Sequence, residues 1–256
     1  MRRFWALKTI ILNELEFAEN IISTGALGES PMFALICVGR YYISQGLGES
    51  DICDRLHALV DKNGKFHWSE IAAEILTACR RRTLLEISNI PVAESEFLAI
   101  KKLGGLQRQR LLFVLLVLAK YHNFVKHDND NWVKYEFRHL FSLANISVSK
   151  IKQCLYINDL MQTGAIEYRH RVDSLDLRVL VLDDTTPAVA NVYDMRNLGF
   201  QYMMHIGMPF FACTSCGITT KRTAGKQKYC PACASAINAQ KTMERYYAKH
   251  NIPREF

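Results

Sequence analysis

The sequence lacks the short motifs that mark the common enzyme classes. It has no glycine-rich phosphate-binding loop, no nucleophile elbow and no paired-carboxylate motif. Its histidines show no metal-ligand spacing with an acidic residue that would support catalysis. We therefore expect a protein that is not an enzyme, and we keep a nuclease as a less favoured alternative.

Long apolar runs are also missing. The longest, Leu111 to Ala119, is about half the length of a membrane span. The opening residues include two arginines, but Lys8, Asn13 and Glu14 interrupt the apolar run that follows, and no small-residue cleavage site comes after it. These absences predict a cytoplasmic protein that does not contact a membrane.

Acidic residues are scarce mainly at the C-terminal end. The chain of 256 residues has a net charge of +7. From Cys213 to Phe256 there are eight basic and two acidic residues, a net charge of +6, which leaves +1 for the first 212 residues. A local excess of positive charge predicts a polyanionic partner more strongly than an even spread of charge.

Four of the eight cysteines form the pattern Cys-x2-Cys-x13-Cys-x2-Cys. They are Cys213, Cys216, Cys230 and Cys233. Two such turns can supply four thiolates to one tetrahedral Zn²⁺, and because four sulfurs fill the coordination sphere this zinc would be structural. Two disulfides or a redox pair are the alternatives. The remaining cysteines are predicted to be reduced residues of the core: Cys37, Cys53, Cys79 and Cys154.

The second cysteine pair is followed by a segment of strong helix formers with no breaker before Pro253. We predict the following order: a tight turn with the first cysteine pair, a hairpin through Thr223 to Lys228, and a helix that carries the second pair. This order is typical of a treble clef; a zinc ribbon is the alternative. The basic residues predicted on the hairpin are Lys221, Arg222, Lys226 and Lys228, and those on one face of the helix are Lys241, Arg245 and Lys249. This surface can face phosphates, or it is simply a solvated face.

Residues 1–125 are predicted to form a helical domain, within a fold that is mainly α. Helices are expected over Phe4–Ser23, Pro31–Gln45, Glu49–Val60, a segment with Ser69 as its N-cap, 91–105 and 106–124. The polar stretch 126–132 is the predicted domain boundary.

Residues 132–184 are predicted to form a winged helix-turn-helix domain. The order is a short helix, a second helix with Ser147 as its N-cap, and a hairpin of two β-branched runs. The predicted inner stripe of the second helix consists of Val148, Ile151, Leu155 and Leu160. Residues 185–208 would form a connecting helix, and 209–256 the zinc-binding module.

In a winged helix the second helix enters the major groove and the hairpin contacts the DNA backbone. The outward residues predicted for the helix are Ser149, Lys150, Lys152, Gln153 and Tyr156, and those of the wing are Arg169, His170, Arg171 and Arg178. Nearby acids such as Asp173 and Asp176 weaken the electrostatic case, so docking to a protein stays open as the second interpretation.

The segments "FACTSCGITTKR", "KQKYCPACASAINAQKT" and "LFSLANISVSKIKQCLYINDLMQTGAI" resemble a group of phage and prophage proteins of Gram-positive bacteria. The resemblance covers most of the chain and implies a setting in a bacterial host cell, but no activity. We expect a nucleic-acid-binding protein, with duplex DNA as the favoured ligand, that acts in phage transcription control or replication. The alternative is an adaptor that holds a host or phage protein such as a polymerase component.

Overall fold

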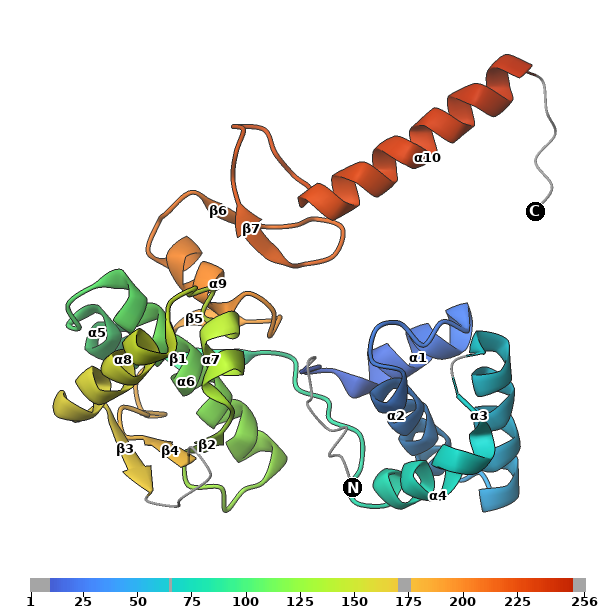
Figure 1. Cartoon of the computed structure of the whole chain (residues 1–256), viewed down its shortest axis with the longest axis horizontal. Helices are drawn as coiled ribbons and strands as arrows, with labels where there is room; N and C mark the ends of the chain where they lie inside the picture. Colours follow the sequence, from blue (N-terminus) through green and yellow to red (C-terminus); the bar gives the residue numbers. More distant parts are fainter. Residues whose placement is uncertain (1–9, 65, 170–175, 251–256) are drawn as a thin grey trace. The chain divides into compact units, whose positions relative to one another are not determined.

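The computed structural model describes residues 10–64, 66–169 and 176–250, and Figure 1 shows its elements. Within these ranges the protein is mainly α, with ten helices and three small sheets. No helix in them combines the length and apolar character needed to cross a bilayer. The chain divides into two compact units. Unit 1 comprises Met1–Pro91, Lys120–Asn129 and Asn191–Met195; unit 2 comprises Val92–Ala119, Asp130–Ala190 and Arg196–Phe256.

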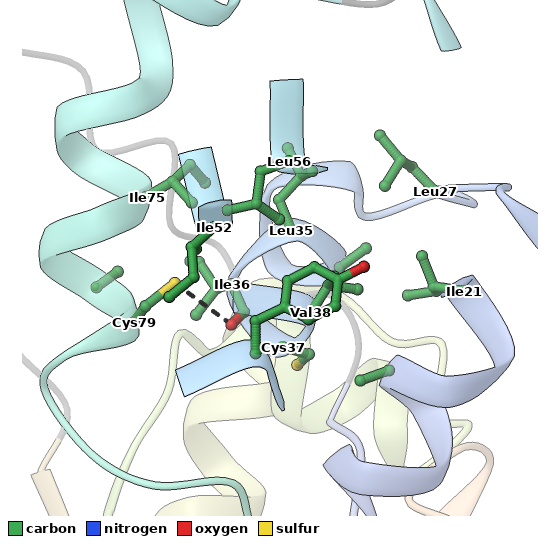
Figure 2. Close-up of a cluster of buried hydrophobic side chains, with 14 of the residues drawn as sticks. Ile21, Leu27, Leu35, Ile36, Cys37, Val38, Ile52, Leu56, Ile75 and Cys79 are labelled. Atoms are coloured by element: carbon green, nitrogen blue, oxygen red, sulfur yellow. Dashed lines mark hydrogen bonds between the residues drawn. The ribbon is translucent and has the colours of Figure 1, made fainter. Parts of the chain in front are cut away.

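Unit 1 is built around four helices. They are α1 (Glu14–Thr24), α2 (Pro31–Ser44), α3 (Glu49–Asn63) and α4 (Trp68–Cys79). Helix α2 packs against each of the other three. Its sequence is apolar on almost every side, and the buried cluster of Figure 2 forms around it, with Leu35, Leu56 and Ile75 completely or almost completely buried.

The start of α1 is held by a buried ionic cluster. The Glu14 side chain is 0% exposed. Its carboxylate accepts hydrogen bonds from Arg82 at 2.6 and 2.7 Å, from Arg40 of α2 at 3.3 Å, and from the backbone N–H of Leu85 at 3.1 Å. Burial and the negative charge of Glu14 raise the pKa of the Tyr121 phenol, in the same unit, to about 12. The cluster therefore fixes α1, α2 and the segment after α4 to one another.

The four cysteines outside the C-terminal pattern are free thiols. Cys37 and Cys79 are buried, as predicted, and burial raises the pKa of both; for Cys79 it reaches about 11. The Cys79 thiol donates to the carbonyl of Ile36 at 3.5 Å (Figure 2). Cys53 is half-buried and Cys154 is exposed, so the prediction of a core position is wrong for Cys154.

Unit 2 contains the other helices and most of the strands. Its helices are α5 (Glu94–Lys101), α6 (Leu106–Val125, up to Ala119), α7 (Phe137–Leu143), α8 (Lys150–Gln162), α9 (Leu198–His205) and α10 (Pro231–His250). Strands β2 (Trp132–Lys134), β4 (Asp176–Val179) and β3 (Ile166–Arg169) form one antiparallel sheet in the order β2-β4-β3. The other sheets pair β1 (Ile90–Ala93) with β5 (Ala188–Val192), and β6 (Phe210–Ala212) with β7 (Thr219–Lys221).

The core of unit 2 lies around α6. The apolar run that the sequence marked as its longest, Leu111 to Ala119, is completely buried. Tyr202 of α9 is also fully buried; its hydroxyl donates to Gln109 at 3.0 Å, and its ring lies 5.4 Å from that of Phe113. Helix α9 is therefore part of the core, and it supports everything that follows it in the chain.

The turn between α7 and α8 packs directly on α9. A Cβ atom at Gly199 would lie 1.9 Å from the carbonyl oxygen of Ala144, so no larger residue fits there without a shift of the backbone. Arg110 of α6 donates to the same carbonyl oxygen at 2.6 and 2.9 Å. Arg110 thus satisfies carbonyls at the end of α7.

Several predicted boundaries differ from those observed. Helix α1 begins at Glu14 with Asn13 as its N-cap, not near Phe4; residues 1–9 lie outside the described residues. The predicted N-cap Ser69 lies inside α4, which begins at Trp68, and Ser149 rather than Ser147 caps α8. Helix α5 and most of α6, predicted to belong to the N-terminal domain, fall in unit 2. The four-domain division stays a prediction.

The buried carboxylate yields a stability prediction. Glu14→Ala would leave Arg40 buried without its ionic partner, so the free energy of unfolding should fall by about 3–5 kcal/mol. Chemical denaturation followed by circular dichroism measures this change. Glu19→Ala removes an exposed acid of the same helix and should cost less than about 0.5 kcal/mol. Equal effects of the two substitutions would contradict a structural role for the cluster.

Candidate functional site

The four cysteines of the C-terminal pattern come together in space. One sulfur from each of Cys213, Cys216, Cys230 and Cys233 lies within 4.8 Å of the other three. Cys213 and Cys230 are buried and the other two are half-buried. Such a group could hold a metal ion, and it is the one group of this kind among the residues that the structure describes.

The first pair lies at the turn between β6 and β7. The Cys213 N–H donates to the carbonyl of Ile218 at 3.0 Å, and the Gly217 N–H donates to the carbonyl of Cys213 at 2.9 Å. Gly217 has a φ of +74°, a left-handed conformation that suits glycine. This tight turn directs both sulfurs to the same side of the hairpin.

The second pair lies at the start of α10. The Cys230 N–H donates to the Cys213 sulfur at 3.2 Å, and Cys233, in the first turn of the helix, donates its N–H to the Cys230 sulfur at 3.4 Å. The predicted helix start is confirmed. The predicted hairpin through Thr223 to Lys228 is wrong: the two strands flank the first pair, and 222–229 form a loop without strands.

Backbone donors change the acidity of the thiols. Burial alone would raise the pKa of Cys213, but backbone N–H groups of Cys230, Cys216 and Ser215 outweigh it and lower this pKa to about 6. For Cys216, burial and hydrogen bonds with the other sulfurs raise the pKa to about 12. The hydrogen bond from the backbone of Ile218 lowers this pKa but does not outweigh them. In the absence of a cation, the thiolate form is therefore favoured at Cys213 over Cys216.

The distances fit a tetrahedral cation. Four sulfurs about 2.3 Å from a central Zn²⁺ lie about 3.8 Å from each other. The Cys216 and Cys230 sulfurs are 3.8 Å apart. A donor set of four thiols favours a soft or borderline cation over Mg²⁺ or Ca²⁺, and it leaves no open position for a reacting water.

Helix α9 anchors the hairpin that carries the first pair. Arg196, just before the helix, donates to the carbonyl of Cys216 at 2.6 Å. The rings of Phe200 and Phe210 lie 4.8 Å apart, and Phe210 is buried. The hairpin that carries the first cysteine pair is thus packed against the core of unit 2 and is not joined to it by a flexible linker alone.

Asn197 connects this hairpin to the turn between α7 and α8. Its side-chain amide donates to the carbonyl of Thr219 in β7 at 3.0 Å, while its side-chain oxygen accepts from the Asn145 amide at 2.9 Å. Asn145 and Asn197 both have positive φ values. Sequence reasoning missed this link, because nothing in the sequence marks Thr219 as the partner of a residue 22 positions earlier.

The basic residues predicted in the C-terminal module are all exposed. Those in and after β7 are Lys221, Arg222, Lys226 and Lys228, and those of α10 are Lys241, Arg245 and Lys249. None of the seven forms an ion pair with a described acid. We call these seven residues the basic surface.

The outward face of α8 differs from the prediction. Ile151 and Leu155, predicted to lie in the inner stripe, are 75% and 54% exposed, while Ile157 and Leu160 are buried. Lys150, Lys152 and Ser149 are exposed, as expected. Gln153 and Tyr156, predicted to face outward, are half-buried: Gln153 donates to the carbonyl of Val148 and Tyr156 stacks on Phe141. The predicted helical face was rotated relative to the one observed.

Of the two cations in the described part of the β3–β4 hairpin, one is paired with acids and the other is not. Arg178 is held between Asp130 at 2.5 Å and Glu167 at 3.2 Å. Arg169 is exposed and lies over the ring of Trp132. The predicted wing residues His170 and Arg171 lie outside the described residues. Among the described hairpin residues, only Arg169 therefore offers a cation with no acidic partner.

Comparisons with known proteins place this chain in no group: no family model, no curated protein and no solved structure matches it.

The four-cysteine group leads to a prediction about metal content. Cys230→Ser should lose the bound metal and unfold the segment after about residue 205, because few side chains of the module are buried. Elemental analysis and limited proteolysis of protein purified without chelator measure both effects. Cys154→Ser, which removes an exposed thiol elsewhere, should keep about one metal ion per chain.

Protein that carries no metal and four free thiols would contradict this prediction. A general loss of helicity in Cys230→Ser would show instead that the core around Tyr202 depends on the module.

Proposed function

We propose that this protein binds nucleic acid, with duplex DNA as the favoured ligand, through a C-terminal module that a structural Zn²⁺ holds together. The zinc assignment rests on the all-cysteine donor set and on the 3.8 Å separation of the Cys216 and Cys230 sulfurs. We assign the module to the treble-clef type because its second pair opens a helix rather than a second hairpin.

The observation that carries the proposal is the contrast between paired and unpaired cations. In the β3–β4 hairpin Arg178 is neutralised by two acids, and Lys134 of β2 pairs with Asp176 at 3.5 Å. All seven residues of the basic surface lack such a partner among the described residues, although they are clustered on 29 residues of one module. Unpaired cations that repel one another favour a bound polyanion, because its phosphates release counterions and relieve the repulsion.

Lys241, Arg245 and Lys249 follow one another at intervals of four, so they form a row along one face of α10. Lys221 and Arg222 lie at the end of β7, in the hairpin that carries the first cysteine pair. The spacing of the row is about 6 Å per step, close to the distance between successive phosphates of a DNA strand. The basic surface therefore suits a phosphate backbone and not a particular base sequence.

We propose further that the segment from β2 to β4 is a winged helix. The order β2, α7, α8, β3, β4 and the antiparallel sheet β2-β4-β3 support this assignment. Asn197 joins the turn before α8 to the zinc-bearing hairpin, so the two parts would present their surfaces in a fixed arrangement. The setting in phage transcription control or replication, in the cytoplasm of a bacterial host, rests on the resemblance of the sequence alone.

Salt dependence of DNA affinity tests the role of the basic surface. Lys241→Ala with Arg245→Ala should weaken binding to any duplex and flatten the plot of log affinity against log salt by about two units, one for each lost phosphate contact. Lys101→Ala with Lys102→Ala, which removes the same charge from exposed positions at the end of α5, should leave the slope unchanged. Equal affinity and slope for wild type and the α10 variant would refute the proposal.

A second candidate function, an adaptor that docks to a protein, is favoured by the outward face of α8. Ile151 and Leu155 are four residues apart, so they lie on the same face of the helix, and both are exposed. Two exposed apolar side chains at the centre of this face are unusual for a helix that contacts phosphates. In this second function the partner would be a polymerase or replication component of the host or the phage.

The variant Ile151→Ser with Leu155→Ser distinguishes the two uses of α8. If α8 lies in the major groove, DNA affinity and sequence preference should both decrease, because apolar side chains there contact thymine methyl groups. If α8 docks to a protein, DNA affinity should stay within about twofold of wild type. A gel-shift or fluorescence-anisotropy titration with several duplexes measures this.

A further inference from the structure

Helix α10 has twenty residues and buries none of them. It begins at the four-cysteine group and continues as one uninterrupted helix (Figure 1). In folded proteins most of the stability of a helix comes from the packing of one of its faces, and no residue of α10 is packed in this way within the chain. The side of α10 that does not carry the basic row is therefore the place to look for a partner.

That side carries a regular pattern. Six residues recur at intervals of four, three, four, three and four: Ala232, Ala236, Ala239, Met243, Tyr246 and His250. Residues with this spacing lie along one face of a helix and form the seam of a coiled coil. We call these six residues the seam. Met243 and Tyr246 are each 53% exposed, and the rings of Tyr246 and His250 are in contact, with their centroids 4.5 Å apart.

The seam is small at one end and large at the other, and the two halves mirror each other. The three alanines lie nine, five and two residues before Lys241, and His250, Tyr246 and Met243 lie nine, five and two residues after it. A second copy of α10 running in the opposite direction would place Ala236 against Tyr246 and Ala239 against Met243. By the same symmetry, Ala232 would face His250. Each layer would then hold one small and one large side chain, which fills space evenly.

We infer that α10 is a self-association surface, and that two copies of this chain pair through their seams in an antiparallel orientation. The proposal does not depend on nucleic-acid binding, because the seam contains none of the cations of the basic row. Lys241 and Arg245 are both two residues from Met243, so they point about 160° away from it and remain exposed in the pair.

Charge also favours the antiparallel orientation. A parallel pair would bring two modules, each with the exposed cations Lys221, Arg222, Lys226 and Lys228, to the same end of the coiled coil. An antiparallel pair separates them by roughly the 30 Å length of a twenty-residue helix, several times the range of unscreened repulsion in physiological salt. It also sets the two helix macrodipoles against each other favourably.

A parallel pair would in addition place alanine on alanine and tyrosine on tyrosine, leaving a gap at one end and crowding at the other. Six thin layers bury an area at the low end of specific interfaces, so the association should be reversible, with a dissociation constant on the order of 10–100 µM. The pair would present two basic rows to a polyanion, and linkage of two modest sites raises the overall affinity.

Sedimentation equilibrium of the metal-loaded full chain, from about 5 µM to about 1 mM, tests the proposal. Wild type should associate reversibly to a dimer. Ala236→Glu and Tyr246→Lys should each lower the association constant at least about tenfold, because each places a charge in an apolar layer. Asn238→Glu, which adds the same charge as the first variant on the opposite face, should associate like wild type.

The double variant Ala236→Glu with Tyr246→Lys decides the orientation. In the antiparallel pair each Glu faces a Lys of the other copy, so the double variant should associate at least about tenfold more tightly than either single variant. In a parallel pair Glu would face Glu and Lys would face Lys, and no recovery would occur. Metal content and circular dichroism of each variant confirm that the fold is intact.

A wild-type chain that stays monomeric at about 1 mM overturns the proposal. So does a dimer that Ala236→Glu leaves unchanged, or a double variant that does not recover. Sedimentation with vesicles of anionic lipid covers another occupant of the seam: a monomer that binds vesicles and loses this binding on Tyr246→Lys would assign the apolar face to a lipid surface instead.

Discussion

The C-terminal module depends on the convergence of four cysteine sulfurs within 4.8 Å. Four thiols at this separation gain little from packing, and a negative charge on more than one of them would be repulsive without a cation. A metal ion bound by these four thiols, such as the Zn²⁺ proposed above, would make this arrangement the strongest interaction of the module. It would hold the start of α10 against the β6–β7 hairpin, and so it would fix where the basic surface and the seam lie relative to the core of unit 2.

The second constraint is the way in which the module is attached. Arg196 and Asn197 bond to backbone carbonyls of Cys216 and Thr219, and Asn197 at the same time holds the turn before α8 through Asn145. Side chains that each join two backbone segments transmit position more rigidly than a flexible linker does. If the C-terminal module and the segment from β2 to β4 act on one partner, they do so as parts of one body.

The two faces of α10 separate two tasks. The basic row would attract a polyanion over a distance of about 8 Å in physiological salt, whereas the seam would act only on contact, through shape. Because Lys241 and Arg245 lie opposite Met243, self-association and phosphate binding would not compete for the same side chains. A reversible dimer would respond to protein concentration, and a polyanion that bridges both rows would stabilise it.

The sequence by itself determined the features that depend on local spacing. Two Cys-x2-Cys turns, a helix beginning beside the second pair and the buried run from Leu111 to Ala119 could be predicted because neighbouring residues alone specify them. Only the tertiary structure decided which face of α8 is buried, since that depends on where Phe141 and β3 pack and not on the apolar character of Ile151 or Leu155. It also decided the roles of Glu14 and Asn197, because their partners lie tens of residues away in the sequence. Local sequence patterns do not specify such long-range contacts.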